Sequence, residues 1–143
     1  MNGAVLYIDD GHDNILLVQR LFQRKCPDIP LHTAMTGHDG VRAAIDNQPG
    51  LILLDNRLPD ASGTQVLGQL AATPATAAIP VVIVSGDSSP VTVRELLAAG
   101  AADFLTKPFD IGMTLILAFA FTRPRFLRRC RRSGRACPTA AAR

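Results

Sequence analysis

The sequence lacks the features that would place a protein in or across a membrane. No run approaches the ~20 apolar residues that a membrane-spanning helix needs, and the longest such run lies at about residues 115–121. The N-terminus has neither the basic start nor the apolar core of a signal peptide. We therefore expect no membrane span and a cytoplasmic location.

Cysteine is also scarce. The three cysteines are an odd number, and Cys130 and Cys137 have no nearby histidine that could complete a zinc site. We expect Cys26 to pack within a helix and the other two to lie on a loose tail. A structural zinc site is therefore not predicted.

What is present is the composition of one globular domain, with an uneven distribution of charge. Apolar residues make up 48% of the 143 positions and charged residues 19%. Residues 1–122 contain seven basic and all twelve acidic side chains, which gives a net charge of −5. Residues 123–143 contain eight arginines and no acid, hence +8. The basic pI therefore comes from the end of the chain and not from its body.

Hydrophobic patterning predicts five repeats of a strand followed by a helix. Short apolar runs predict strands, and Asp13, Thr36 with Asp39, and Ser62 are placed to begin three of the helices. This alternation is typical of an α/β fold with a parallel sheet and helices on both faces. We expect strands at residues 4–9, 31–34, 51–55, 79–85 and 103–106, and helices at 14–26, from 36, from 62 and at 91–99.

Polar residues stand where the predicted strands end. The first strand ends in Asp9-Asp10, the third in Asp55, the fourth in Ser85, and the fifth runs into Lys107. In a doubly wound sheet these ends meet at one edge. Three carboxylates so close together would repel one another unless a hard cation lay between them, and oxygen ligands favour magnesium. The pattern therefore predicts a Mg²⁺ site.

The same residues suit phosphoryl transfer. Asp55 ends the most apolar strand and is the expected nucleophile, while Ser85 and Lys107 could contact the phosphoryl oxygens. Taken singly, each residue has a plainer interpretation: the first two acids could cap a helix, and Lys107 could be a solvated lysine. Phosphatases with an aspartyl nucleophile need a second acid two positions later, where this chain has Arg57.

The chain resembles the receiver domain of two-component response regulators over residues 4–110. The resemblance lies in Leu6-Tyr7-Ile8-Asp9-Asp10, in Leu51–Asp60 with Gly63, in Val81–Gly86, and in Ala98–Ala101 through Phe104–Phe109. It implies the flavodoxin-like strand order 2-1-3-4-5 and a signalling domain rather than an enzyme.

The resemblance also implies a role for each site residue. Asp55 would accept a phosphoryl group from a histidine kinase or a histidine phosphotransfer protein. Asp9, Asp10, Asp55 and the backbone carbonyl of Arg57 would bind Mg²⁺. Ser85 and Phe104 would form the switch, although Phe104 could equally be a core aromatic. The partner would dock on the first helix, where Leu17, Arg20 and Lys25 lie outside the apolar stripe.

The end of the chain departs from the family. Residues 111–122 would form the last helix of a receiver domain spanning 1–122, but 112–122 contain no charge, whereas the family's last helix is amphipathic. Residues 123–143 are expected to be a disordered basic tail. This end could bind nucleic acid without sequence specificity, could rest on an anionic membrane surface or a partner subunit, or could be the product of a shifted reading frame.

The resemblance allows a further assembly and two further interpretations of the chain. Two copies could pair through the last strand and helix, which would make a homodimer. A binding-only pseudo-receiver and a fragment of a hybrid histidine kinase remain as alternatives to a phosphoryl-accepting domain.

Overall fold

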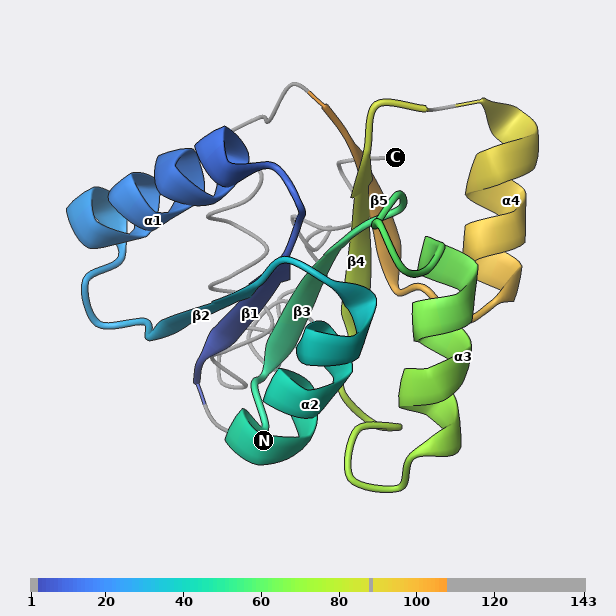
Figure 1. The fold of residues 1–143 in the computed structure, drawn as a ribbon, viewed down its shortest axis with the longest axis horizontal. Helices are drawn as coiled ribbons and strands as arrows, with labels where there is room; N and C mark the ends of the chain where they lie inside the picture. Colours follow the sequence, from blue (N-terminus) through green and yellow to red (C-terminus); the bar gives the residue numbers. More distant parts are fainter. Residues whose placement is uncertain (1–2, 88, 108–143) are drawn as a thin grey trace, which may run out of the picture.

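The computed structural model describes residues 3–87 and 89–107. Its centre is a five-stranded parallel sheet in the order β2-β1-β3-β4-β5, as predicted (Figure 1). The strands are β1 (Val5–Ile8), β2 (Leu31–Ala34), β3 (Leu51–Asp55), β4 (Val81–Ser85) and β5 (Asp103–Thr106). All carboxyl ends therefore lie along one edge, which we call the carboxyl edge.

Helices cover both faces of this sheet. The four described helices are α1 (His12–Lys25), α2 (Gly37–Asn47), α3 (Gly63–Ala72) and α4 (Pro90–Ala98). Helices α2, α3 and α4 pack on one face, where Ala44, Val66 and Leu96 join the core. Helix α1 packs on the other face through Ile15, Val18 and Phe22 (Figure 1).

Strand β3 is buried on both faces because its residues alternate between the two cores. Ile52 and Leu54 face α2 and α3, whereas Leu51 and Leu53 belong to the core beside α1. All four are fully buried, and burial of each such side chain contributes roughly 1.5–3 kcal/mol. This explains why the strand that ends in Asp55 has no polar residue before it.

Helix α2 lies unusually close to the sheet. A Cβ atom at Gly40 would lie only 2.5 Å from Cδ1 of Ile8, so a larger residue there would force the Ile8 side chain to shift. The first turn of α2 thus packs directly on the last residue of β1.

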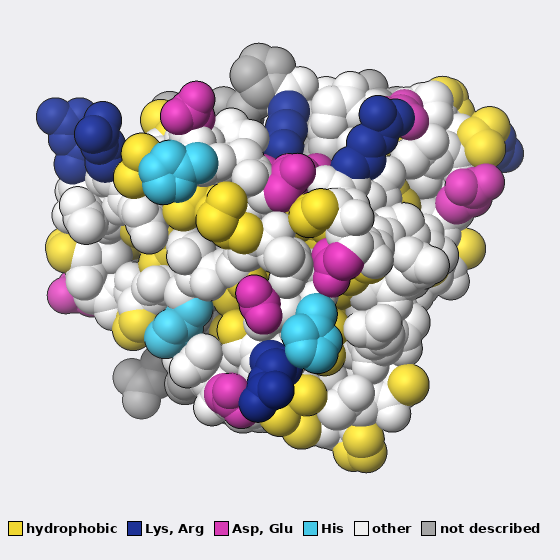
Figure 2. All heavy atoms as spheres, in the orientation of Figure 1, with side chains coloured by type: hydrophobic (Ala, Val, Ile, Leu, Met, Phe, Trp, Pro, Cys, Tyr) yellow, Lys and Arg dark blue, Asp and Glu magenta, His cyan; other side chains and the backbone are white. Residues whose placement is uncertain are grey.

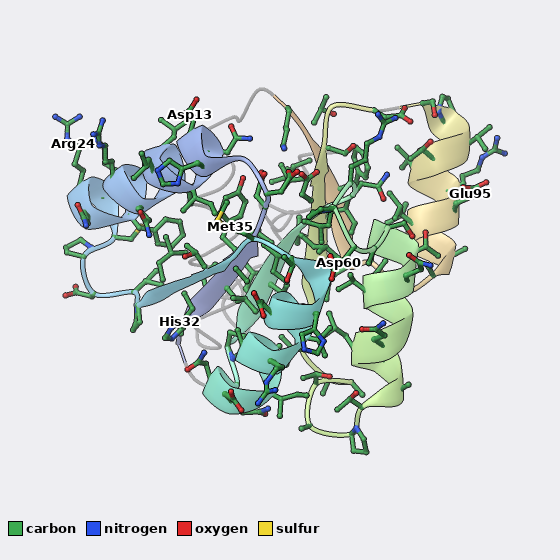
Figure 3. The ribbon with its side chains drawn as sticks, in the orientation of Figure 1. Asp13, Arg24, His32, Met35, Asp60 and Glu95 are labelled. Atoms are coloured by element: carbon green, nitrogen blue, oxygen red, sulfur yellow. The ribbon has the colours of Figure 1, made fainter. Side chains whose placement is uncertain are left out.

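Two predicted helix caps are confirmed and one is wrong. The hydroxyl groups of Thr36 and Ser62 accept hydrogen bonds from the third residue of their helices, and Ser62 forms a full capping box with Gln65. Asp13 does not cap α1, because the helix begins earlier, with Gly11 at its N-cap. Asp13 therefore lies within the first turn, on the outside of the helix (Figure 3).

Strand and helix boundaries elsewhere shift by one or two residues. Strand β4 begins at Val81 and not at Ile79, because the Ile79 N–H donates to the carbonyl of Thr76 in a turn and Pro80 has no N–H to donate. Helix α4 begins one residue before its expected start, because Ser89 caps it and Pro90 occupies its first position.

Several sequence predictions fall outside the described residues. They concern the helix expected at 111–122, the tail 123–143, and Cys130 with Cys137. Among the described residues, Cys26 is buried in the core beside α1, as expected. None of the helices that the structure describes is long and apolar enough to cross a bilayer.

Candidate functional site

Three carboxylates meet at the carboxyl edge. Because Ile8 pairs with Leu54 in the parallel register, Asp9 and Asp55 follow as neighbours on adjacent strands. One carboxylate oxygen of each of Asp9, Asp10 and Asp55 lies within 4.8 Å of the others. Asp9 and Asp55 are buried and Asp10 is exposed. Acidic and basic side chains lie next to one another along this upper rim in Figure 2.

Lys107 is the cation that contacts two of these acids. Its Nζ atom lies 3.0 Å from Oδ2 of Asp9 and 3.5 Å from Oδ2 of Asp55. The backbone holds the lysine in place, since the Lys107 N–H donates to the carbonyl of Ser85 at 2.8 Å. Its side chain keeps 23% exposure, so it is less constrained than the acids it contacts.

Asp9 receives hydrogen bonds from several directions. The Tyr7 hydroxyl donates to Oδ2 at 2.6 Å, and the Asn14 amide donates to the same oxygen at 3.3 Å. The Gly11 N–H donates to Oδ1 at 2.7 Å. This carboxylate is therefore fixed by the strand that precedes it and by the start of α1 that follows it.

Asp55 is in a less favourable environment. Burial raises the pKa of its carboxyl above the ordinary value, and the charge of Asp9 raises it further. The ammonium of Lys107 opposes this shift, and so does a backbone N–H from Arg57, 3.4 Å from Oδ1. The upward direction of the Asp55 pKa shows that burial and like charge outweigh the lysine. A bound cation would relieve that penalty.

An open hollow lies beside these groups. It has a volume of about 460 Å³ and is lined by residues at or after the carboxyl ends of β1, β3, β4 and β5. Ser85 at its wall is buried, and its Oγ accepts a hydrogen bond from the Asp87 N–H at 3.1 Å. The lining residues are Asp10, Asp55, Arg57, Ser85, Gly86, Asp87 and Lys107.

Asp87 links this hollow to α4. Its carboxylate accepts from the Ser89 N–H at 3.0 Å and from the Thr92 hydroxyl at 3.1 Å. These bonds lower the pKa of Asp87, with the Ser89 bond as the largest cause. The loop after β4 is thus tied at one end to Ser85 and at the other to the first turn of α4.

Asp60 connects the loop after β3 to α2. Its two carboxylate oxygens accept the backbone N–H groups of Gly37 at 2.7 Å and His38 at 3.0 Å. Figure 3 shows Asp60 beside the first turn of α2. The two bonds lower the pKa of Asp60, which matches a carboxylate at the positive end of a helix.

The structure brings together most of the residues that the sequence singled out. Asp9, Asp10, Asp55, Ser85 and Lys107 lie at the carboxyl edge, and Arg57 lines the hollow beside them. Phe104 is partly buried against the core on the α2 side. Leu17, Arg20 and Lys25 are exposed on α1.

Sequence reasoning missed the partners of these residues. It did not anticipate the contacts of Tyr7 and Asn14 with Asp9, or the place of Asp87 in the hollow. One signal was available, because residues two apart on a strand point to the same face. Tyr7 therefore had to lie on the same side of β1 as Asp9.

A family model and several curated proteins match the chain. The model of the response regulator receiver domain matches residues 5–117. The response regulator PleD of Caulobacter vibrioides is 32% identical over 123 residues, which cover 86% of this chain and 27% of PleD. The transcriptional regulatory protein KdpE of Mycobacterium tuberculosis is 41% identical over 86 residues, covering 60% of this chain and 36% of KdpE. The chain thus spans about a third or less of these two relatives.

Solved structures share the fold at lower sequence identity. The receiver domain of a sensor histidine kinase from Pseudomonas aeruginosa, with a magnesium ion in its active-site cleft, superposes with a TM-score of 0.75 at 20% identity, covering 85% of this chain and 98% of that one. The signal receiver domain of a LuxO repressor protein from Vibrio parahaemolyticus gives 0.75 at 24% identity, covering 90% and 98%. Both are similar to this chain in fold.

Proposed function

The chain belongs to the response regulator receiver domain family of two-component signalling, and from this premise we propose that Asp55 accepts a phosphoryl group from a phosphohistidine. The observation that supports this most directly is the arrangement of Lys107 between the carboxylates of Asp9 and Asp55, with Asp10 in the same cluster. A buried carboxylate whose pKa is raised by its surroundings is typical of a functional site, which favours this proposal over a binding-only domain.

The transfer step follows from the position of Asp55 at the open hollow. A carboxylate oxygen of Asp55 attacks phosphorus and forms an O–P bond. The P–N bond to the donor imidazole breaks, and its electron pair stays on the ring nitrogen. Lys107, already 3.5 Å from Asp55 Oδ2, would pair with the phosphoryl oxygens, and Ser85 would donate its hydroxyl to them. The chain would act as the acceptor of this group and not as an enzyme on a separate substrate.

The donor set fits a magnesium ion. Three carboxylates with oxygens within 4.8 Å of one another supply the hard ligands that this ion prefers. Asp9, Asp10, Asp55 and the backbone carbonyl of Arg57 would hold it. When bound, Mg²⁺ would neutralise charge on the phosphoryl oxygens and allow the donor phosphate to approach the acids.

The switch would act through the hydrogen bonds at the two ends of the loop after β4, one to Ser85 and the others to the start of α4. Movement of Ser85 towards a phosphoryl group would release the Asp87 N–H that now donates to its hydroxyl, and Asp87 is bonded to the start of α4. Phe104 on β5 is partly buried and would repack with that loop. A change at the hollow could thus reach the surface of α4 and β5.

The partners follow as part of the proposal. A histidine kinase or a histidine phosphotransfer protein would dock on α1, where Leu17, Arg20 and Lys25 are exposed.

The proposal is tested by the intact mass of the protein after incubation with Mg²⁺ and a small phosphodonor. The wild type should gain one phosphoryl group only when Mg²⁺ is present. Asp55→Asn should gain none, whereas Asp46→Asn, an exposed aspartate on α2, should behave as wild type. A folded wild type that binds Mg²⁺ and gains no mass would contradict the proposal and favour a binding-only domain.

A further inference from the structure

The only tyrosine of the chain lies directly behind the acidic site. Tyr7 is fully buried in the core beside α1, together with Phe22 and Leu53. Its hydroxyl nevertheless donates to Oδ2 of Asp9 at 2.6 Å, the shortest of the hydrogen bonds that the described residues make to this carboxylate. A core aromatic is thus joined to a group proposed as a metal ligand.

The donors to Asp9 differ in how firmly they are held. Lys107 is partly exposed and divided between Asp9 and Asp55, so its bond to Asp9 is not exclusive. The Asn14 amide is more distant, at 3.3 Å. Tyr7 and the Gly11 N–H each bind a different oxygen of Asp9 at 2.6 and 2.7 Å. One firm bond to each oxygen fixes both the position and the plane of the carboxylate.

The proposed transfer would change this balance. Once Asp55 bears a phosphoryl group, Lys107 is expected to turn to its oxygens and away from Asp9. Asp9 is 1% exposed, so the carboxylate that loses the ammonium depends mainly on its protein hydrogen-bond donors. The Tyr7 hydroxyl cannot leave, because the ring is enclosed in the core.

We propose that Tyr7 is a positioning residue, whose hydroxyl holds Asp9 in place for the cation both before transfer and when Lys107 moves to the phosphoryl group. This rests on the proposed function, since it presupposes a metal and a transfer at this site. A partner behind a metal ligand fixes its orientation, and loss of such partners typically weakens metal binding about 10–100-fold. The alternative is that the phenol merely satisfies its own hydroxyl in the core.

The two interpretations are separated by Tyr7→Phe, which keeps the ring and removes the hydroxyl. We expect its Kd for Mg²⁺, measured by calorimetry on the full chain, to rise about tenfold. The matched control is Thr76→Val, which also deletes a buried hydroxyl, one that donates to the Leu70 carbonyl at 2.7 Å. That variant should lose stability and keep the wild-type Kd.

An unchanged or lower Kd in Tyr7→Phe would overturn the proposal, as would an equal rise in both variants. A wild type that binds no Mg²⁺ would instead refute the proposed function on which the inference rests, so the two failures are distinct.

A second measurement needs no variant. Because the chain has one tyrosine and no tryptophan, its intrinsic emission comes from Tyr7. A phenol hydrogen-bonded to a carboxylate emits weakly, and a cation that draws charge from Asp9 should weaken this quenching. We expect the emission to rise during a Mg²⁺ titration, with the Kd that calorimetry gives. Unchanged emission at saturating Mg²⁺ would overturn the proposal even if Tyr7→Phe failed to fold.

Discussion

The two edges of the sheet differ in the charge of their buried polar side chains. At the carboxyl edge Asp9, Asp55 and Ser85 are buried, and the two acids share one ammonium. At the amino edge, just before β4, the buried polar residue is Thr76, which donates to the carbonyl of Leu70. Within the described part of the chain, every buried polar side-chain atom has a hydrogen-bond partner at both edges. Among the buried side chains that the structure describes, those with surplus charge lie at the carboxyl edge.

This difference separates a structural polar group from a functional one. The hydroxyl of Thr76 is neutral and fully satisfied, so nothing further would be gained by a ligand there. The acids at the other edge are satisfied as hydrogen-bond acceptors but remain crowded as charges, which the raised pKa of Asp55 reflects. The free energy that such crowding costs the folded state is available to a cation that binds there.

Magnesium should therefore stabilise the protein through one edge. At a hundredfold excess over its Kd the ion should raise the free energy of unfolding by about 2.7 kcal/mol, and a chelator should remove this gain. Thermal unfolding with and without Mg²⁺ measures the effect. If Asp55→Asn gains as much as the wild type, the ion acts elsewhere.

Loss of the Lys107 ammonium should lower the free energy of unfolding, because Asp9 and Asp55 would then repel each other without a cation between them. Lys107→Met keeps most of the side-chain stem and leaves Asp9 and Asp55 unpaired. Breaking a fully buried ion pair costs about 3–5 kcal/mol, and we expect about 2 kcal/mol here because the lysine is 23% exposed. Denaturant unfolding without metal tests this. Added Mg²⁺ should restore more stability to this variant than to the wild type, and equal gains would contradict the charge argument.

At the amino edge, deletion of a buried hydroxyl should lower the stability of the fold and should have no effect on Mg²⁺ binding. Thr76→Val leaves the Leu70 carbonyl without its 2.7 Å donor, which should cost about 1 kcal/mol of unfolding free energy. The cost should be the same with and without Mg²⁺ in thermal unfolding. A dependence on Mg²⁺ would show that the two edges are coupled.

Removal of one charge at the carboxyl edge should have the opposite sign. Asp55→Asn deletes a carboxylate that is buried and lies beside Asp9, so the metal-free variant should unfold at a slightly higher temperature than the wild type at pH 7. Asp46→Asn on the exposed side of α2 is the control. A lower unfolding temperature for Asp55→Asn would mean that its bond to Lys107 outweighs burial.

The smallest effect is expected at Asp60, which is exposed. Its folded pKa is lowered by the N–H groups of Gly37 and His38, so it stabilises the fold above the unfolded pKa, about 3.9. This contribution is lost as pH falls through the folded pKa. Asp60→Asn should therefore unfold at a lower temperature than the wild type at pH 7, and the difference should shrink in acid. If the difference in unfolding temperature between Asp60→Asn and the wild type stays constant as the pH falls, the charge of Asp60 does not stabilise the fold.

The sequence was sufficient for much of the fold and for the set of polar residues that meet at the carboxyl edge. Strands β2, β3 and β5 have the predicted bounds; Pro30 stands directly before β2 and Gly50 directly before β3. The helix start at Gly11 was missed, since it depends on the bond from its N–H to Asp9. The contact of Asp60 with α2 joins residues 22 and 23 apart in sequence. Local sequence propensity does not predict hydrogen bonds between residues so far apart, so the structure was needed to find them.

The bond between Lys107 and Asp9 joins residues 98 positions apart, which bears on the order in which the molecule is made. A ribosome delivers Asp9, Asp10 and Asp55 long before Lys107. A nascent chain from which only β1 to β4 have emerged would thus contain the three acids but not yet Lys107. Pairing of β5 with β4 then places Lys107, the residue after β5, beside Asp9 and Asp55. The acids therefore gain their ammonium when the last of the five described strands joins the sheet.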